Sequence, residues 1–572
     1  MKQTIFTRLV VAMPVIVTLF VTDQALDPFN IGKFSVLLLG ASLLLLTLPS
    51  TLINFANLKE NKLIYLSLSF FCFAHLITIF LTKQDIYRGL MGVWGRNNGF
   101  LSYLSLAILF FCGVIFVNKN GDIRIIKSIS FLGTLLSIYG LMQSQNADFF
   151  HYTFIGSPVF LTLGNEDFSS VFLVISIICT LFLISVYKSD LQKIAIFFCA
   201  VFQIYILFHM NTAQSKVGLI SSAFIFMLFK YKNFRQNSPR QKYILYFVTT
   251  TSILTTLIGL IGIGPLSFIN QNLGSLNSRY LHWVAGWKMF TSNLIYGVGI
   301  DSYGDFQPEF RILDQNNIPD TYSNNAHNLI VQFLSTGGIL LFAGYVLFMF
   351  GIAGKLKKVV LKEDMDNNRK ILYVSIFVLN LFNIAIGIDN LALIVWFWIF
   401  TSSIVALSNS SNFNQNTKRI GVHPSSNYSI RKISTLLAVF SVFLIPANYL
   451  TITSFVYELQ LQNLFVKVNK EGINKDTMEQ IYRKGLQHHD PDARMLVIKF
   501  LYAGKENNLA YKLSLDSLQY FPRNLRLLES TFQYNRLTGN NSEALRIKNK
   551  MIELDPLNPD FKNDLESISV TK

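Results

Sequence analysis

Residues 100–117 read FLSYLSLAILFFCGVIFV and contain no charged side chain. A helix needs about 20 mainly apolar residues to cross a hydrocarbon core of about 30 Å, so this stretch is typical of a membrane-spanning helix. Similar blocks recur along the 572 residues, of which 51% are hydrophobic and only 14% charged. These figures argue against a soluble globular protein, and they exclude a disordered, collagenous or disulfide-scaffolded chain. The cysteines all lie inside apolar blocks and are expected to be inert thiols: Cys72, Cys112, Cys179 and Cys199.

The apolar blocks predict an all-α polytopic membrane protein with about 12 to 13 transmembrane helices and one large external loop. The first block is expected to be an anchor and not a cleaved leader, because no small-residue cleavage site follows it. We place spans near 5–22, 34–53, 63–82, 100–117, 126–143, 168–187, 194–210, 217–229, 243–263, 329–352, 371–388, 391–406 and 434–457.

Lysine and arginine indicate the orientation of these spans, since positively charged loops tend to stay in the cytoplasm. With a cytoplasmic N-terminus, the inner segments carry about three times as many Lys and Arg as the outer loops. The net charge of +16 is therefore mostly a topology signal, and we do not expect nucleic-acid binding. Residues 458–572 then lie outside the membrane, on the extracytoplasmic face.

Residues 458–572 have the composition of a soluble helical domain. Pro491, Pro522 and Pro556 recur at intervals typical of tetratricopeptide repeats, each just after an apolar helical stretch. We expect about three helical hairpins, which could hold a protein partner or an acceptor. A generic helical bundle remains the alternative.

The long external loop 264–328 is where we expect the chemistry, since long structured loops in compact units are usually functional. Arg279 and Trp283 are spaced to lie on one face of a helix. A glycine turn, Gly297-Val298-Gly299, follows, and the loop closes at His327-Asn328 before a span interrupted by Gly337-Gly338.

This pattern resembles the signature of the bacterial O-antigen ligase and polymerase superfamily, which includes protein O-oligosaccharyltransferases. The segment from Gly92 to Gly99, GVWGRNNG, is similar to a glycine-arginine-glycine loop of many members, and Gly164-Asn165 to their Gly-Asn at a span start. Ser215-Lys216 stands where the family commonly has Ser-Arg. The resemblance covers about residues 5–406, and several members also carry a tetratricopeptide tail.

The resemblance implies transfer of a glycan from an undecaprenyl-pyrophosphate carrier to an acceptor hydroxyl on the outer face of the cytoplasmic membrane, without cofactor or metal. The acceptor could be lipid A core, as in lipopolysaccharide biosynthesis, a growing polysaccharide or a protein. A leaving pyrophosphate gains negative charge, and the planar guanidinium of Arg279 could grip two of its oxygens. The imidazole of His327 could take the acceptor's proton as general base.

The other candidate substrate contacts each have a structural alternative. We expect Lys216, Arg96 and Arg88 at the phosphates, although the two arginines could be ordinary external charges. Trp283 could contact sugar or anchor the interface, while Asn165 and Asn328 could bind substrate or cap helices. A metal site formed by scattered loop carboxylates remains an alternative, with Asp301, Asp305 and Asp320 as its candidates.

Two unlike functions compete with transfer. A transporter or lipid-linked glycan flippase would need ionisable residues within the membrane, for which His75 and His209 are the obvious candidates. A scaffold built around the helical tail would leave the loop residues without a role. Glycan transfer accounts for the candidate catalytic residues of the external loop, and it is the function that we expect.

Overall fold

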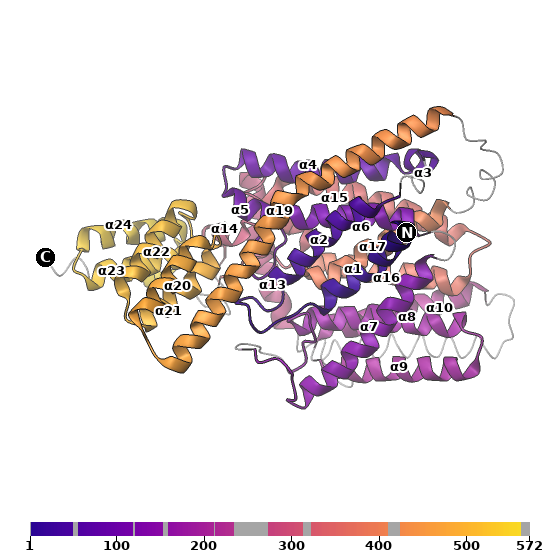
Figure 1. Ribbon diagram of the computed structural model, residues 1–572, viewed down its shortest axis with the longest axis horizontal. Coiled ribbons are helices and arrows are strands. Elements are labelled where there is room, and N and C mark those ends of the chain that lie inside the picture. The colour runs from indigo at the N-terminus through magenta and orange to yellow at the C-terminus, as the bar shows by residue number, and fades with distance from the viewer. Residues whose placement is uncertain are drawn as a thin grey trace.

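The computed structural model describes residues 2–49, 55–117, 121–152, 158–210, 212–233, 273–312, 322–409 and 424–561. Within these ranges all regular secondary structure is helical, and there is no strand. Apolar helices form one elongated bundle, and the C-terminal helices project from one end of it (Figure 1). The all-α fold class predicted from the sequence is confirmed.

Among the described residues, eight helices are long and apolar enough to cross a membrane by length and composition: α4 (Lys62–Leu81), α7 (Gly121–Ser144), α8 (Glu166–Val186), α9 (Asp190–Phe208), α15 (Leu329–Leu361), α16 (Asn367–Ile386), α17 (Leu391–Asn409) and part of α19 (Pro424–Glu471). Four others are apolar but shorter, or apolar over a shorter stretch: α1 (Lys2–Leu19), α2 (Ile31–Thr47), α6 (Phe100–Phe116) and α10 (Ala213–Asn233). These helices coincide with all the predicted spans except 243–263, which lies outside the described residues.

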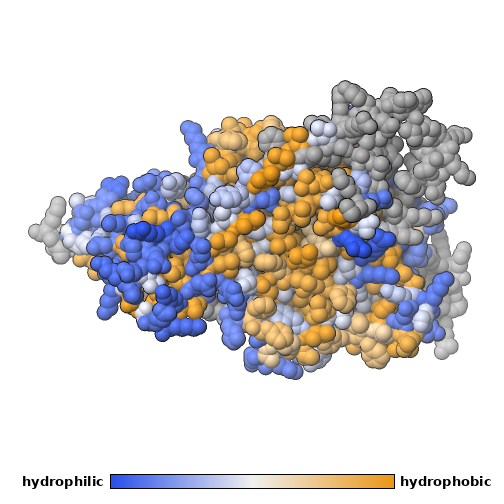
Figure 2. All heavy atoms as spheres, viewed as in Figure 1, coloured by the Kyte–Doolittle hydropathy of each residue, from blue (hydrophilic) through white to orange (hydrophobic). Residues whose placement is uncertain are grey.

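Helix α17 forms the centre of the bundle because it carries no charge and can be surrounded on all sides. It packs against α1, α6 and α15, and every residue in it except Ala406 is buried. The indole Nε1 of Trp396 donates to Thr18 Oγ1 at 2.9 Å, so the polar atom of this buried indole has a hydrogen-bond partner. The outer helices instead expose large apolar side chains, and Figure 2 shows hydrophobic side chains across one face of the bundle beside a hydrophilic tail.

Further helices lie at the two ends of the bundle. At the end next to the tail lie α5 (Ile86–Met91), α13 (Leu273–Ser292) and α14 (Tyr303–Phe310), while α3 (Phe55–Glu60) lies at the other end (Figure 1). The predicted external loop thus contains α13 and α14, and it shares one end of the molecule with the tail.

The tail continues from α19, which runs from the bundle into the C-terminal domain without a break (Figure 1). The boundary predicted at residue 457 therefore falls inside one helix. Helices of 13 or 14 residues follow and pack each on the next: α20 (Lys475–Gln487), α21 (Pro491–Ala503), α22 (Asn507–Tyr520), α23 (Leu525–Leu537) and α24 (Asn541–Leu554). Pro522 and Pro556 directly follow α22 and α24. The tetratricopeptide assignment itself stays a prediction.

Candidate active site

The glycine turn of the external loop is anchored to the break in α15. Val298 and Gly299 donate backbone N–H groups to Ser335 O and Thr336 O at 2.8 and 3.1 Å. Gly338 interrupts the helix with φ 63°, and a Cβ there would lie 2.4 Å from the backbone of Ile295. Only a glycine accepts both constraints without strain. The turn at Gly297–Gly299 and the helix break at Gly338 therefore pack directly against each other, and we call this contact the glycine joint.

His327 occupies a strained turn just before α15. Its φ is 52°, its N–H donates to Asn325 Oδ1 at 2.8 Å, and its carbonyl accepts from Trp283 Nε1 at 3.4 Å. The His327 ring stacks on that of His282, with centroids 5.6 Å apart and planes at 23°. The imidazole is therefore oriented from α13 on one side and by its own turn on the other.

The surroundings of His327 favour its neutral form. Burial, together with the nearby charges of Arg96, His282 and Arg279, lowers its pKa from 6.5 to about 3. Positive charge close to an imidazole disfavours protonation. At neutral pH, His327 therefore carries a free lone pair on one ring nitrogen and can accept a proton.

Arg279 lies in α13 and faces the start of α8. Its Nη2 is 3.7 Å from Asp167 Oδ2, and the arginine side chain is only 17% exposed. It is thus not a freely solvated loop charge. Because Asp167 remains 42% exposed, an incoming anion could compete with it for the guanidinium.

Arg96 lies in the loop between α5 and α6 and lines one cavity together with His327. Its Nη1 atom is buried and has no hydrogen-bond partner among the described residues. A buried guanidinium nitrogen without a partner is costly, and an anionic ligand would remove that cost. Of the predicted phosphate contacts, Arg96 has the surroundings that most favour one.

Arg88 is engaged in a different way. It is 4% exposed and lies 3.4 Å from Asp305 and 3.9 Å from Asp490 of the tail, with the Phe521 ring 5.2 Å from its guanidinium carbon. These contacts favour a structural role, in which Arg88 joins the external loop to the tail.

Two predicted substrate contacts act as helix caps. Asn165 Oδ1 accepts from Asp167 N–H at 2.7 Å at the start of α8. Asn328 Oδ1 accepts from Val331 N–H at 3.0 Å, and its Nδ2 donates to Ala385 O at 2.8 Å. Both caps satisfy backbone donors that a helix start leaves open, so their contact with substrate stays a prediction.

Lys216 belongs to the first turn of α10, which packs against α8 and α16. A Cβ on Gly218 would lie 3.7 Å from Val174 of α8. The start of α10, with Lys216, therefore packs beside α8, the helix whose first turn carries Asp167.

A cavity of about 280 Å³ opens beside His327. Arg96 and His327 line it together with residues of the external loop and of the tail. Arg279 and Lys216 are not among its lining residues.

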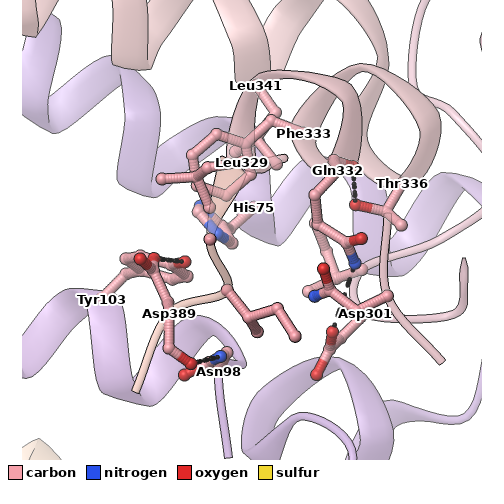
Figure 3. A pocket seen from close by; sticks show the side chains of 14 residues that line it. His75, Asn98, Tyr103, Asp301, Leu329, Gln332, Phe333, Thr336, Leu341 and Asp389 are labelled. Atoms are coloured by element: carbon pink, nitrogen blue, oxygen red, sulfur yellow. Dashed lines mark hydrogen bonds between the residues drawn. The ribbon is translucent and has the colours of Figure 1, made fainter. Parts of the chain in front are cut away.

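A second cavity of about 20 Å³ is lined partly by polar groups (Figure 3). Of these, Asp301 was predicted only as a possible metal ligand, and Gln332, Tyr103 and Asp389 were not predicted from the sequence. Asp301 Oδ2 accepts from Val93 N–H at 2.7 Å, while Gln332 reaches Asp301 with Nε2 and accepts from Ala326 N–H at 2.9 Å. Asp301 and Gln332 thereby tie the Arg96 loop to the His327 turn. Tyr103 and Asp389 share a hydrogen bond of 2.6 Å in the same cavity.

These contacts bear on the open question of metal binding. Asp301 is held by Val93 and Gln332, and Asp305 by Arg88, while Asp320 lies outside the described residues. Within the described ranges no three His, Cys, Asp or Glu side chains cluster as metal ligands would.

Comparison with known proteins adds one finding. Residues 167–346 match the sequence model of the O-antigen ligase family. The matched segment begins at the ion-pair partner of Arg279, contains Lys216, Arg279, Trp283 and His327, and extends beyond the break in α15. None of the curated proteins matches the chain. Residues 167–346 thus have the sequence pattern of the O-antigen ligase family.

Proposed function

We propose that this protein transfers a glycan from an undecaprenyl-pyrophosphate carrier to an acceptor hydroxyl at the outer face of a bacterial cytoplasmic membrane. The observation that carries the proposal is the neutral imidazole of His327 between two arginines, Arg96 and Arg279, inside a site that includes the O-antigen ligase segment. A base beside fixed positive charge is what this substitution at a sugar carbon requires.

In the proposed reaction, the acceptor oxygen attacks the anomeric carbon of the donor sugar. The bond from that carbon to the pyrophosphate oxygen breaks, and the acceptor proton passes to His327. Arg279 stabilises the charge that develops on the leaving pyrophosphate, while Lys216 and Arg96 are further candidates for phosphate contact. A planar guanidinium can donate to two phosphate oxygens at once, which a lysine cannot do.

Donor binding would also prepare the base. A pKa of about 3 makes resting His327 a weak base, and general bases work best when their pKa lies near the working pH. Phosphate charge beside Arg279 and Arg96 would offset their repulsion and raise the pKa of His327. The base would therefore strengthen when a donor is present, which limits unproductive protonation in the empty site.

The transporter alternative has weaker support. His75 lies within α4, where its Nδ1 is 3.0 Å from Phe71 O and its ring packs against Phe71 and Tyr103. These contacts are those of a core residue. His209 stands at the end of α9, bonded to Tyr205 O, where a mid-membrane relay would not need it.

The experiment that tests the proposal is transfer by the purified full-length protein in nanodiscs, from an undecaprenyl-pyrophosphate-linked glycan donor. Lipid A core, a carrier-linked glycan and a Ser/Thr peptide would be offered as acceptors, with and without chelator. We expect metal-independent transfer that His327→Ala and Arg279→Ala abolish or greatly weaken. Full activity of both variants would overturn the mechanism, and loss on chelation would require a metal.

A further inference from the structure

The C-terminal tail forms one wall of the cavity beside His327. Asp492 of α21, and Arg523 and Arg526 around the start of α23, line it from the tail, while Asn324 and His327 line it from the external loop. The tail is therefore part of the site and does not stand apart from the membrane bundle as a separate recognition module would.

The tail wall is held in place by buried and stacked contacts. Arg523 pairs with Glu309 of α14 and stacks on Phe306, with its guanidinium carbon 4.2 Å from the ring centroid. The indole Nε1 of Trp94 donates to Glu458 Oε1 of α19 at 2.8 Å. Glu458 is fully buried, and a buried charge is tolerated only when it is paired. Arg523 and Glu309 are 31% and 40% exposed, and their pair adds a second link between the tail and the external loop.

The polar groups of the cavity suit a hydroxylated ligand. Arg526 and Asp492 lie 3.6 Å apart, with side chains 55% and 24% exposed, and Asn324 faces the same space from the opposite wall. Together they offer guanidinium hydrogen-bond donors, carboxylate acceptors and an amide group that both donates and accepts. Sugar hydroxyls donate and accept hydrogen bonds, as this set requires.

The cavity is less suited to a peptide. Peptides are usually bound as an added strand, in an apolar groove or on an aromatic-lined groove for proline-rich segments. The described part of the chain has no sheet edge, and the cavity walls are formed largely by charged and amide side chains. Its volume of about 280 Å³ is near the lower limit of about 300 Å³ for ligand cavities, which fits a terminal sugar better than a polypeptide.

We propose that Arg526, Asp492 and Asn324 form an acceptor subsite that binds the terminal sugar of a saccharide acceptor and directs its hydroxyl toward His327. This inference rests on the proposed function. It places the donor pyrophosphate at Arg279 and Arg96, and the acceptor sugar in the part of the cavity that Arg526, Asp492 and Asn324 line between the loop and the tail.

Acceptor kinetics of the full-length protein in nanodiscs test the subsite. The donor is an undecaprenyl-pyrophosphate-linked glycan, and the saccharide probes are lipopolysaccharide lacking its distal glycan and a carrier-linked glycan. Arg526→Ala and Asn324→Ala should each raise the KM for the saccharide acceptor about tenfold, the usual effect of losing a good hydrogen bond to ligand. The KM for donor should stay within about twofold.

Arg546→Ala is the matched control, because Arg546 is an exposed arginine of the tail that pairs with Glu543 away from the cavity. It should leave both KM values unchanged. Equal acceptor KM values in all variants, or transfer only to a Ser/Thr peptide, would overturn the saccharide subsite while leaving glycan transfer intact. If the unmodified protein transferred glycan to none of these acceptors, the proposed function itself would fail, and this inference with it.

Discussion

Arg311 and Asp555 form an ion pair of 2.6 Å between the external loop and the end of α24, with side chains 2% and 0% exposed. The pair has two hydrogen bonds, because Arg311 Nε also donates to Asp555 Oδ1 at 3.1 Å. The hydroxyl of Tyr322 donates to the same carboxylate at 3.2 Å. The last helix of the tail is thereby joined to the loop that leads to His327.

Removing one partner of this pair should loosen the tail. Arg311→Ala leaves the buried carboxylate of Asp555 without its charge partner, and such a loss usually costs about 3–5 kcal/mol. We expect a lower melting temperature and faster proteolysis of the tail. Arg546→Ala removes an exposed pair and should cost under about 1 kcal/mol. Equal melting temperatures for both variants would mean that the buried pair does not hold the tail.

The geometry of Arg279 should matter as much as its charge. Arg279→Lys keeps the positive charge but loses the planar fork, so a phosphate clamp should lose about 10²–10³-fold in turnover, nearly as much as Arg279→Ala. Transfer rates at matched folded amount test this. A lysine variant with nearly full activity would reduce Arg279 to a general positive charge paired with Asp167.

Helix positions were predictable from the sequence because long charge-free blocks can lie only in lipid or in a core. The glycine joint was visible too, since Gly297, Gly299 and Gly338 stand where helical or extended backbone would not need them. The local pattern thus identified the elements, but not which of them meet.

Long-range pairing was beyond the sequence. Arg88 meets Asp490 of the tail, about 400 residues away, and nothing in either neighbourhood specifies the other. Asp301 could be noticed as a loop carboxylate, but its link to Gln332 depends on the packing of α15 against the external loop. Arg96 near His327 is likewise a product of tertiary structure. Glycines flanking Arg96 were the only signal that this loop was special.

The lysine at position 216 offers a gain-of-function test. The family resemblance places an arginine there, and Lys216→Arg would restore a guanidinium able to bind two phosphate oxygens. We expect unchanged or lower KM for the donor and undiminished turnover. Lys216→Ala should raise the donor KM if the residue contacts phosphate. A variant series in which donor KM does not respond would remove Lys216 from the site.

The break in α15 should tolerate only glycine at position 338. Gly338→Ala adds a Cβ 2.4 Å from the backbone of Ile295, at a φ of 63° that L residues rarely adopt, which should cost about 1–3 kcal/mol. We expect less folded protein and a lower melting temperature. Gly354→Ala is the control in the same helix, because no atom lies within 4 Å of a Cβ at that position. Equal stability of the two variants would contradict a requirement for glycine at position 338.

The pH dependence of transfer tests the assignment of His327 as base. Its folded pKa of about 3 lies below the ordinary value of 6.5, so the neutral, proton-accepting form persists as the pH falls through 6.5 and is lost only near pH 3. The pH profile of kcat/KM reports groups of the free enzyme. It should therefore show no acid limb from His327 near pH 6.5, whereas an ordinary exposed histidine would produce one.

The kcat profile should differ, because it reports the donor-bound state. Phosphate charge beside Arg96 and Arg279 raises the pKa of His327, so kcat should begin to fall at a higher pH than kcat/KM. Arg96→Gln removes one repelling charge and should move the acid limb of kcat/KM upward, whereas Arg546→Gln should not. His327→Ala should lower turnover by about 10²–10⁴-fold with donor KM retained, and its residual activity should lack the limb. An acid limb that persists in His327→Ala would assign the base to another group.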